Sequence, residues 1–329
     1  SVRSHFGSSF SLVAGTSAAV SNATSDLEMP FLGDTLCDVA GSFSVRGCTH
    51  NVCVDFQPEK SSEAIPRVRT GATGHADASS TQAACTTPRG MAVARLQSGF
   101  DMVVLEGKDI VSQSLLSSGT WEYSSATVLA QAMGSALPIN GTFVDIGANL
   151  GYYSMLFAQA GFNVLAFEPM TRNRAAIEAT LCLHPELRTR VKVVPAALVA
   201  PDEVENTSCV IRSTNYDINI GNGFLKCGRS DEVAKCAVGD ENCEMVPVMT
   251  LDDALARESP ASIDVVKMDV EAFECHVIAG GETLFTRYRP EMLKIETEWG
   301  TKSCVQAAAQ RHNYRTVDLG TDTALVRKD

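Results

Sequence analysis

From residue 122 to the C-terminal end, short apolar runs alternate with longer segments whose apolar residues recur at helical spacing. The short runs predict β-strands, and the longer segments predict amphipathic helices. The predicted strands span residues 142–146, 164–167, 191–197, 263–268, 292–295, 314–318 and 323–326. The predicted helices span residues 126–133, 152–159, 172–183, 272–279, 282–288 and 303–312, and a further helix begins after Thr250 as N-cap. Strands that alternate with helices imply an α/β fold in which helices cover both faces of a parallel sheet.

The first part of the chain lacks this alternation. Residues 1–89 are rich in Ser, Thr, Ala and Gly, with short apolar runs at 10–13 and 43–45 that predict small strands. Residues 91–96 and 100–105 predict a hairpin around Gly99. A short helix is expected from Asp109 to residue 116.

Composition narrows the partners of the protein. Its 329 residues carry a formal net charge of −12, and no run of Lys or Arg occurs. Nucleic acid and anionic membranes both need clustered cations, so neither is expected as a partner. No apolar stretch approaches the ~20 residues of a transmembrane helix. The chain begins with Ser1 rather than Met, so we expect a processed or trimmed product.

The cysteines are numerous and unevenly placed. Of eleven, two groups of four lie in predicted loops: Cys37, Cys48, Cys53 and Cys85, and then Cys209, Cys227, Cys236 and Cys243. Cys182, Cys275 and Cys304 fall in predicted helices. Each group of four is expected to form disulfides, with three possible pairings if it pairs internally. Zinc is the alternative, but it favours C-x-x-C pairs, and the sequence contains none.

Three glycosylation sequons, at Asn22, Asn140 and Asn206, agree with the cysteines on a secretory route. We therefore expect a disulfide-bonded glycoprotein of the Golgi or endoplasmic reticulum lumen or of the extracellular space. A cytoplasmic enzyme is the alternative.

Residues 143–169 carry the strongest functional signal. An apolar strand ends at Asp145, and the turn from Gly147 to Gly151 opens a helix. The next apolar strand ends at Glu168, which can accept both hydroxyls of a ribose. This βαβ unit predicts a nucleotide site at the carboxyl ends of its strands.

The spacing of the turn distinguishes between cofactors. A dinucleotide site has G-x-G-x-x-G, whereas here Ala148, Asn149 and Leu150 separate the two glycines. A carboxylate at Asp145 would repel a pyrophosphate but suits a ligand with an amino group. S-adenosylmethionine carries an amine, a sulfonium and a ribose, so the pattern favours it over NAD. A tight turn with a capping acid and no ligand is the alternative.

Other strand ends add candidate residues on the same rim. The third strand ends at Ala196 and Ala197, which are small enough for an adenine ring to lie flat. The fourth supplies Lys267, Asp269 and Glu271, and the fifth supplies Glu296 and Glu298.

Methyl transfer to a hydroxyl requires a base for the acceptor proton. Asp269 or Glu271 can serve, with Lys267 nearby to tune the base or orient the acceptor. His276 is a second candidate because of its near-neutral pKa, although a satisfied helix residue is the simpler interpretation. The clustered acids can instead bind Mg²⁺, which would chelate a diol of the acceptor.

These motifs together resemble the FkbM family of S-adenosylmethionine-dependent O-methyltransferases. The matching segments begin at Val144 (Val-Asp-Ile-Gly-Ala-Asn-Leu-Gly-Tyr-Tyr-Ser), Ala166 (Ala-Phe-Glu-Pro), Thr250 (Thr-Leu-Asp-Asp) and Val266 (Val-Lys-Met-Asp-Val-Glu). The resemblance covers residues 100–326. It implies a Rossmann-like class I methyltransferase domain at 100–329, with a cysteine-rich insertion at 203–246. Residues 1–99 then form a cysteine-containing N-terminal region of unknown role.

The resemblance also assigns site residues. It implies cofactor contacts from Asp145, Gly147, Asn149, Gly151, Glu168 and Asn173, and active-site acids at Asp269 and Glu271. Ala197 joins the cofactor set from its place at a strand end. The family usually has Glu-Gly where this chain has Glu271-Ala272, and the added methyl is expected to narrow the pocket.

The leading hypothesis is an O-methyltransferase that acts on a hydroxyl of a sugar or glycan; a small-molecule hydroxyl acceptor is the close alternative. A non-catalytic extracellular module that keeps the fold is the second hypothesis, and an NAD-dependent oxidoreductase is disfavoured. Residues 215–223, rich in Gly and Asn, predict either a lid on the acceptor side or a plain surface loop.

Overall fold

The structure is a computed structural model that describes residues 46–49, 52–55, 85–204, 207–213, 218–229, 236–237, 239–240 and 242–328. The chain divides into two compact units, residues 1–79 and 80–329. In the first unit, strands β1 (Arg46–Thr49) and β2 (Val52–Asp55) pair antiparallel. The strands predicted at 10–13 and 43–45 lie outside the described residues.

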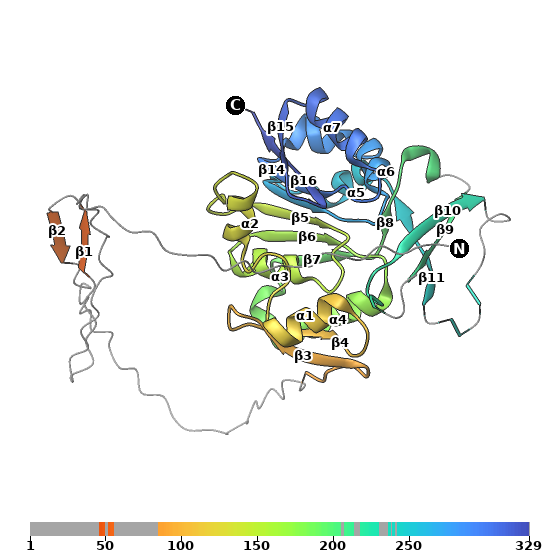
Figure 1. The fold of residues 1–329 in the computed structure, drawn as a ribbon, viewed down its shortest axis with the longest axis horizontal. Coiled ribbons are helices and arrows are strands. Elements are labelled where there is room, and N and C mark those ends of the chain that lie inside the picture. The colour runs from red at the N-terminus through yellow and green to blue at the C-terminus, as the bar shows by residue number, and fades with distance from the viewer. Residues whose placement is uncertain are drawn as a thin grey trace, which may run out of the picture. The chain divides into compact units, whose positions relative to one another are not determined.

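A seven-stranded sheet forms the centre of the second unit, in the order β15-β16-β14-β13-β5-β6-β7 (Figure 1). Its strands are β5 (Thr142–Ile146), β6 (Asn163–Phe167), β7 (Val191–Val194), β13 (Val265–Met268), β14 (Met292–Glu296), β15 (Tyr314–Asp318) and β16 (Asp322–Arg327). The strands from β7 to β14 run parallel, and β16 is antiparallel to both of its neighbours. This arrangement confirms the predicted Rossmann-like class I methyltransferase sheet.

Helices cover both faces of the sheet, as predicted. They are α1 (Ile110–Ser118), α2 (Ala126–Ala132), α3 (Tyr152–Gln159), α4 (Thr171–Leu183), α5 (Leu251–Glu258), α6 (Glu274–Ala279) and α7 (Lys302–Arg311), with short turns η1 (Pro185–Leu187), η2 (Pro201–Glu203) and η3 (Leu284–Tyr288). Successive strand residues face opposite sides. Phe143 therefore packs with α1 to α4 in one core, whereas Val144 packs with α5, α6 and α7 in another. No helix among the described residues is long and apolar enough to cross a membrane.

The predicted hairpin is β3 (Met91–Arg95) with β4 (Asp101–Leu105), and it belongs to the second unit. The boundary expected after residue 99 falls within its turn. The hairpin lies on α4, where the backbone N–H of Val103 donates to Thr180 Oγ1 at 2.9 Å. This packing brings Cys85 to Cys182, and the two form a disulfide. Cys85 is therefore disulfide-bonded as expected, but its partner lies outside the N-terminal group.

The insertion folds into a small antiparallel sheet rather than a loop. Its strands β9 (Thr207–Arg212), β10 (Phe224–Arg229) and β11 (Cys243–Val246) pair in the order β10-β9-β11. The disulfides Cys209–Cys227 and Cys236–Cys243 confirm that this group of cysteines pairs internally. A further disulfide that we did not expect joins Cys275 on α6 to Cys304 on α7.

The third strand is shorter than predicted. It ends at Val194 because Pro195 follows, and proline has no N–H to give to a strand ladder. Ala197 lies instead in β8 (Ala197–Leu198), which pairs parallel with β12 (Val248–Met249).

Candidate functional site

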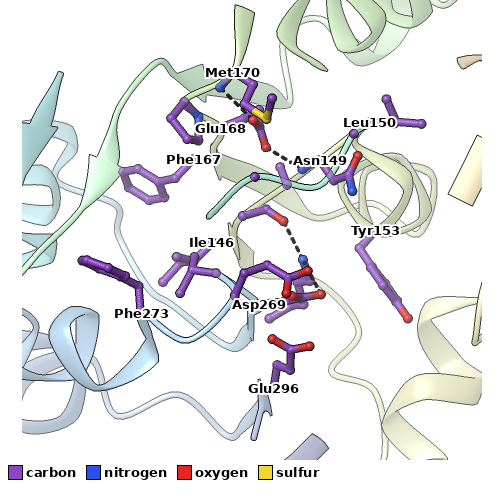
Figure 2. A pocket seen from close by; sticks show the side chains of 18 of the residues that line it. Ile146, Asn149, Leu150, Tyr153, Phe167, Glu168, Met170, Asp269, Phe273 and Glu296 are labelled. Carbon is purple, nitrogen blue, oxygen red and sulfur yellow. Dashed lines mark hydrogen bonds and ion pairs between the residues drawn. The ribbon is translucent and has the colours of Figure 1, made fainter. Parts of the chain in front are cut away.

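A cavity of about 260 Å³ opens at the carboxyl ends of the parallel strands (Figure 2). In sheets of this kind, the loops that follow the strands build the ligand site. Each of the four central strands contributes to the cavity. Its lining includes Ile146 and Gly147 at the end of β5, Glu168 after β6, Lys267 and Asp269 at the end of β13, and Glu296 at the end of β14.

The turn after β5 adopts the conformation that its glycines predict. Gly147 and Gly151 have φ angles of 76° and 83°, in the left-handed region that favours glycine. A side chain at Gly147 would overlap the carbonyl oxygen of Asp269, and one at Gly151 would approach Ile177 to 2.8 Å. Gly147 and Asn149 line the cavity, whereas Gly151 serves to pack the turn against α4.

Glu168 lies where the second strand was predicted to present its acid. Its Oε2 accepts the Asn149 backbone N–H at 2.7 Å, and Oε1 accepts that of Met170 at 2.8 Å (Figure 2). The Asn173 side chain also donates to Oε1, at 3.3 Å. Burial raises the pKa of Glu168 to about 7, although the two backbone donors oppose the shift. The carboxylate keeps lone pairs for further donors on the cavity side.

Asp145 takes a different position from the one that its place at a strand end suggests. It is fully buried and is not among the residues that line the cavity. Its Oδ2 accepts the Ser154 hydroxyl at 2.7 Å, and its Oδ1 lies 3.9 Å from Lys267 Nζ. Burial raises the pKa of Asp145, and Lys267 opposes that shift.

Lys267 connects the turn with the acids. Its ammonium group donates to the Gly147 carbonyl oxygen at 2.6 Å and lies 3.5 Å from Asp269 Oδ2. Burial lowers the pKa of Lys267, but the carboxylates of Asp269 and Asp145 outweigh burial and raise it above the ordinary value. Lys267 therefore stays protonated at neutral pH.

The residues fit S-adenosylmethionine by the chemistry of their polar atoms. Asn149 Oδ1 and Asp145 Oδ1 are buried without a hydrogen-bond partner among the described residues. Of these two residues, only Asn149 lines the cavity, and its Oδ1 together with the Glu168 carboxylate suits the ammonium and ribose hydroxyl donors of this cofactor. Lys267 is the single cation among the described residues of the lining, and it is already engaged, so a pyrophosphate is poorly matched. Ala197 lines the cavity and offers only a small side chain.

Three acids converge on the other side of the cavity. One carboxylate oxygen from each of Asp269, Glu271 and Glu296 lies within 4.8 Å of the others. Burial raises the pKa of Glu271 to about 7 and that of Glu296 to about 9, and the charge of Asp269 adds to both shifts. Such a cluster can take up a proton, hydrogen-bond to hydroxyl groups or hold a divalent cation.

Glu271 and Ala272 both have positive φ angles, 53° and 76°. The position that is usually glycine in the family thus keeps a glycine-like backbone here. The methyl group of Ala272 was expected to narrow the pocket, but Ala272 is not among the lining residues.

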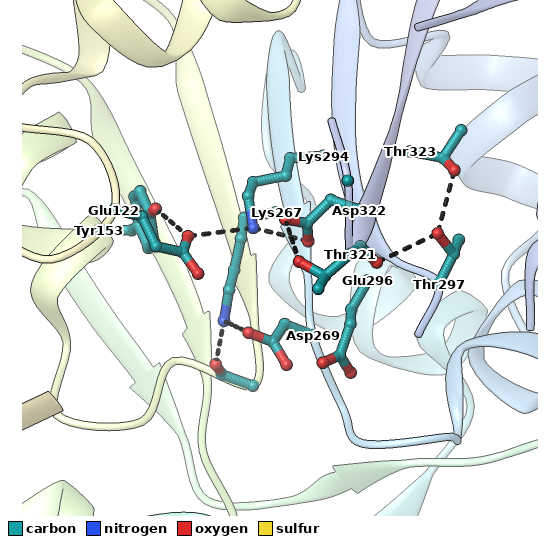
Figure 3. Close-up of polar contacts among 12 residues, drawn as sticks. Glu122, Tyr153, Lys267, Asp269, Lys294, Glu296, Thr297, Thr321, Asp322 and Thr323 are labelled. Carbon is teal, nitrogen blue, oxygen red and sulfur yellow. Dashed lines mark hydrogen bonds and ion pairs between the residues drawn. The ribbon is translucent and has the colours of Figure 1, made fainter. Parts of the chain in front are cut away.

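A buried polar network beside the acids was not predicted (Figure 3). Lys294 on β14 donates to Asp322 at 2.7 Å and lies 3.2 Å from Glu122, which accepts the Tyr153 hydroxyl at 2.6 Å. Glu122 and Tyr153 line the cavity. A lysine inside an apolar strand was the available signal, because such a charge needs a buried partner.

Besides Asp145 and Gly151, two further predicted residues lie off the cavity. His276 is bound through Nδ1 to Glu203 at 2.8 Å and stacks on Phe273, so the structure does not bring it to the acids. Asn173 does not line the cavity either; it connects Glu168 with the Gly221 carbonyl oxygen, to which it donates at 2.9 Å. The insertion residues Asn219, Gly221 and Gly223 do line the cavity, although only the lid hypothesis pointed to them.

Comparison with known proteins agrees with this geometry. A sequence model of the FkbM methyltransferase domain matches residues 145–311, about half of the chain. No curated protein matches.

Solved structures that resemble the fold include an FkbM methyltransferase from Methylobacillus flagellatus KT, at 18% identity and a TM-score of 0.38. The match covers 58% of this chain but only 44% of that one. A precorrin-6Y C5,15-methyltransferase from Geobacter metallireducens GS-15 matches at 12% identity, 60% and 85% coverage and a TM-score of 0.32. The human methyltransferase 10 domain containing protein matches at 13% identity, 61% and 80% coverage and a TM-score of 0.33.

The methyltransferase sheet and the fit of the cavity imply S-adenosylmethionine as the cofactor. With the family match across residues 145–311, they lead to one assignment. The chain belongs to the FkbM methyltransferase family.

Proposed function

We propose that this protein is an O-methyltransferase that transfers a methyl group from S-adenosylmethionine to a hydroxyl group of a sugar or glycan. The observation that carries the proposal is the meeting of Asp269, Glu271 and Glu296 in the cavity that Glu168 and Gly147 also line. One side of the cavity thus suits the cofactor, and the other holds acids that suit a hydroxyl acceptor.

On the cofactor side, Glu168 and Asn149 would bind the ribose and amine donors, and Gly147 lets the backbone approach closely. Gly151 packs the turn against α4, and Asn173 donates to Glu168, so both act without touching the cofactor. Ala197 leaves space for the adenine. Asp145 would act from beneath the turn, through Ser154 and Lys267. The cofactor supplies an electrophilic methyl group on a sulfonium.

On the acceptor side, we assign Glu271 as the general base. A catalytic base works best when its pKa lies near the working pH, and the pKa of Glu271 is raised to about 7. The negative charge of Asp269 contributes to the raised pKa of Glu271. Asp269 is itself held by Lys267, whose Nζ lies 3.5 Å from Asp269 Oδ2. The hydroxyl proton passes to Glu271 as the acceptor oxygen takes the methyl group.

A saccharide acceptor is supported by an aromatic residue at the edge of these acids. Trp299 follows β14, is 50% exposed and packs edge-on against Phe224, with ring centroids 5.7 Å apart. Its indole also hydrogen-bonds to Glu271. A half-exposed ring beside carboxylates suits the apolar face and the hydroxyl edge of a sugar.

Mg²⁺ is a further group that the three acids can hold. Carboxylate oxygens are its usual protein ligands, and a diol of the acceptor can complete its coordination. Dialysis against EDTA followed by a calcium and magnesium series tests this role. Unchanged turnover after chelation would limit the acids to proton and hydrogen-bond chemistry.

We place the enzyme in the secretory lumen or outside the cell. Four disulfides among the described residues and the exposed Asn140 sequon support this location. Electrophoresis with and without reductant on protein from its native source tests it. Equal mobility under both conditions would favour the cytoplasm.

The experiment that tests the function is incubation with radiolabelled S-adenosylmethionine and a panel of saccharides and glycoproteins, with small-molecule alcohols as a second panel. Label should enter a saccharide as a methyl ether with the wild type, and Glu271→Gln should lower turnover about 100-fold or more while cofactor affinity stays near wild type. Asp269→Asn should lower it less. Calorimetric titration that shows no cofactor binding would instead support a non-catalytic module.

A further inference from the structure

The tip of the insertion, residues 218–223, is tied to the cofactor side of the site. The Gly221 N–H donates to Oδ2 of Asp109 at 2.8 Å, and the Gly221 carbonyl oxygen accepts from Asn173 at 2.9 Å. Asp109 is fully buried and also caps α1. The backbone of this tip is therefore fixed on both sides by side chains from the main fold.

The contact at Gly221 leaves no space for a side chain. A Cβ there would lie 2.7 Å from Asp109 Oδ2 and 3.1 Å from Asn149 Oδ1. Because Asn149 belongs to the turn after β5, the tip is packed directly on the cofactor-binding turn. The insertion thus forms one wall of the cavity. Asn222, which follows Gly221, is placed with little conformational freedom.

That next residue reaches the acceptor side. Asn222 donates its side-chain N–H to Oε1 of Glu271 at 2.6 Å. Glu271 has a positive φ of 53°, a conformation that needs support from its surroundings when the residue is not glycine. Among the described residues of the insertion, Asn222 is the one whose side chain holds the Glu271 carboxylate.

We propose that Asn222 is the positioning residue of Glu271, and that the insertion thereby couples the cofactor turn to the acceptor base. The inference rests on the proposed function, because it assigns Glu271 the role of base. A donor on Oε1 at 2.6 Å fixes the direction of the Glu271 carboxylate toward the acceptor side.

Asn222→Asp is the sharpest variant, because it keeps the shape of the side chain but replaces the N–H donor with an oxygen. Asn222→Ala removes the side chain. Asn242→Ala is the matched control: Asn242 lies on the same insertion, its side chain contacts Arg172, and it does not line the cavity. The full chain is used throughout.

The first readout needs no acceptor and is the crystal structure of each variant. In Asn222→Asp and in Asn222→Ala, we expect the Glu271 carboxylate to leave its wild-type orientation, because the N–H donor on Oε1 is lost. Asn242→Ala should keep that orientation. A Glu271 carboxylate that keeps its wild-type position in both Asn222 variants overturns the proposal.

The second readout is methyl transfer. Loss of a hydrogen bond to a charged group should lower kcat/KM about 10- to 100-fold in Asn222→Asp, with the acidic limb of the pH profile moved to higher pH. The affinity for S-adenosylhomocysteine should stay within about threefold, because Gly221 keeps its backbone anchors. Wild-type turnover in Asn222→Asp overturns the proposal. A wild type that methylates no hydroxyl overturns the proposed function alone, and the crystal structures of the variants still decide the role of Asn222.

Discussion

Lys267 on β13 and Asp145 on β5 are register partners on neighbouring parallel strands, and their charged groups lie 3.9 Å apart with both side chains buried. The same ammonium group holds the Gly147 carbonyl oxygen and pairs with Asp269. One cation therefore joins the strand end, the glycine turn and the acceptor acids.

Lys267→Met should destabilise the fold and disorganise the turn. Removal of one partner leaves Asp145 buried without its counter-charge, which costs about 3–5 kcal/mol of unfolding free energy. Urea unfolding measures this loss. Lys302→Met is the control, because Lys302 pairs with Asp318 on the exposed surface and should stay close to the wild type. Equal unfolding free energies of the two variants would show that the buried Asp145 does not depend on Lys267 as its counter-charge.

The glycine turn can be tested with two alanine substitutions that share the same backbone strain. Gly147 and Gly161 have φ angles of 76° and 96°, so alanine is strained at both. Only at Gly147 does the added methyl group meet an atom, the Asp269 carbonyl oxygen; at Gly161 nothing lies within 4 Å. Gly147→Ala should weaken S-adenosylhomocysteine binding about 100-fold or more by calorimetry. Gly161→Ala should bind as the wild type does, and a similar loss in both variants would point to general strain instead.

The sequence was most informative where periodicity and glycine placement agree. Strand β5 and helix α3 have the predicted bounds, because an apolar run, a glycine turn and a helical pattern follow one another without conflict. The direction of a side chain at a strand end is not encoded in this way. Asp145 still lies inside β5, opposite Ala166, whereas Glu168 follows β6. Only Glu168 lines the cavity, since Ser154 and Lys267 hold Asp145 beneath the turn.

Contacts between distant segments were harder to predict. The Cys85–Cys182 disulfide depends on the hairpin packing against α4, and the partnership of Lys294 with Glu122 depends on which segment covers β14. The strands of the insertion were missed because polar, cysteine-bearing sequence gives little alternation. Their pairing relies in part on the cross-strand disulfide Cys209–Cys227.

The crowded acids predict a stability that depends on pH. The pKa of Glu296 is raised to about 9 by burial and by Asp269, whereas an unfolded glutamate titrates near ~4.3. The folded state therefore binds the extra proton, and this contribution is complete below ~4.3 and is lost as the pH rises through about 9. Unfolding free energy from urea curves should fall across that window. Glu296→Gln should flatten the fall and be the more stable form at pH ~9.

Glu298→Gln is the control for this effect, because Glu298 is an exposed acid two residues further along the same segment. It should leave the pH dependence as it is in the wild type. If Glu296→Gln and the wild type show the same dependence of unfolding free energy on pH, Glu296 is ionised in the folded protein. A proton on Glu296 then does not relieve the repulsion among the three acids.

Ala272 offers a prediction of increased stability. Its φ of 76° is costly for alanine by about 1–2 kcal/mol, and glycine avoids this cost but loses about 0.5–1 kcal/mol through the greater freedom of the unfolded chain. Ala272→Gly should therefore raise the unfolding free energy by about 0.5–1 kcal/mol. Ala256→Gly, at an exposed site inside α5, should lower it by about 1 kcal/mol. Opposite signs for the same substitution would identify backbone strain next to Glu271, whereas destabilisation in both would mean that Ala272 is unstrained.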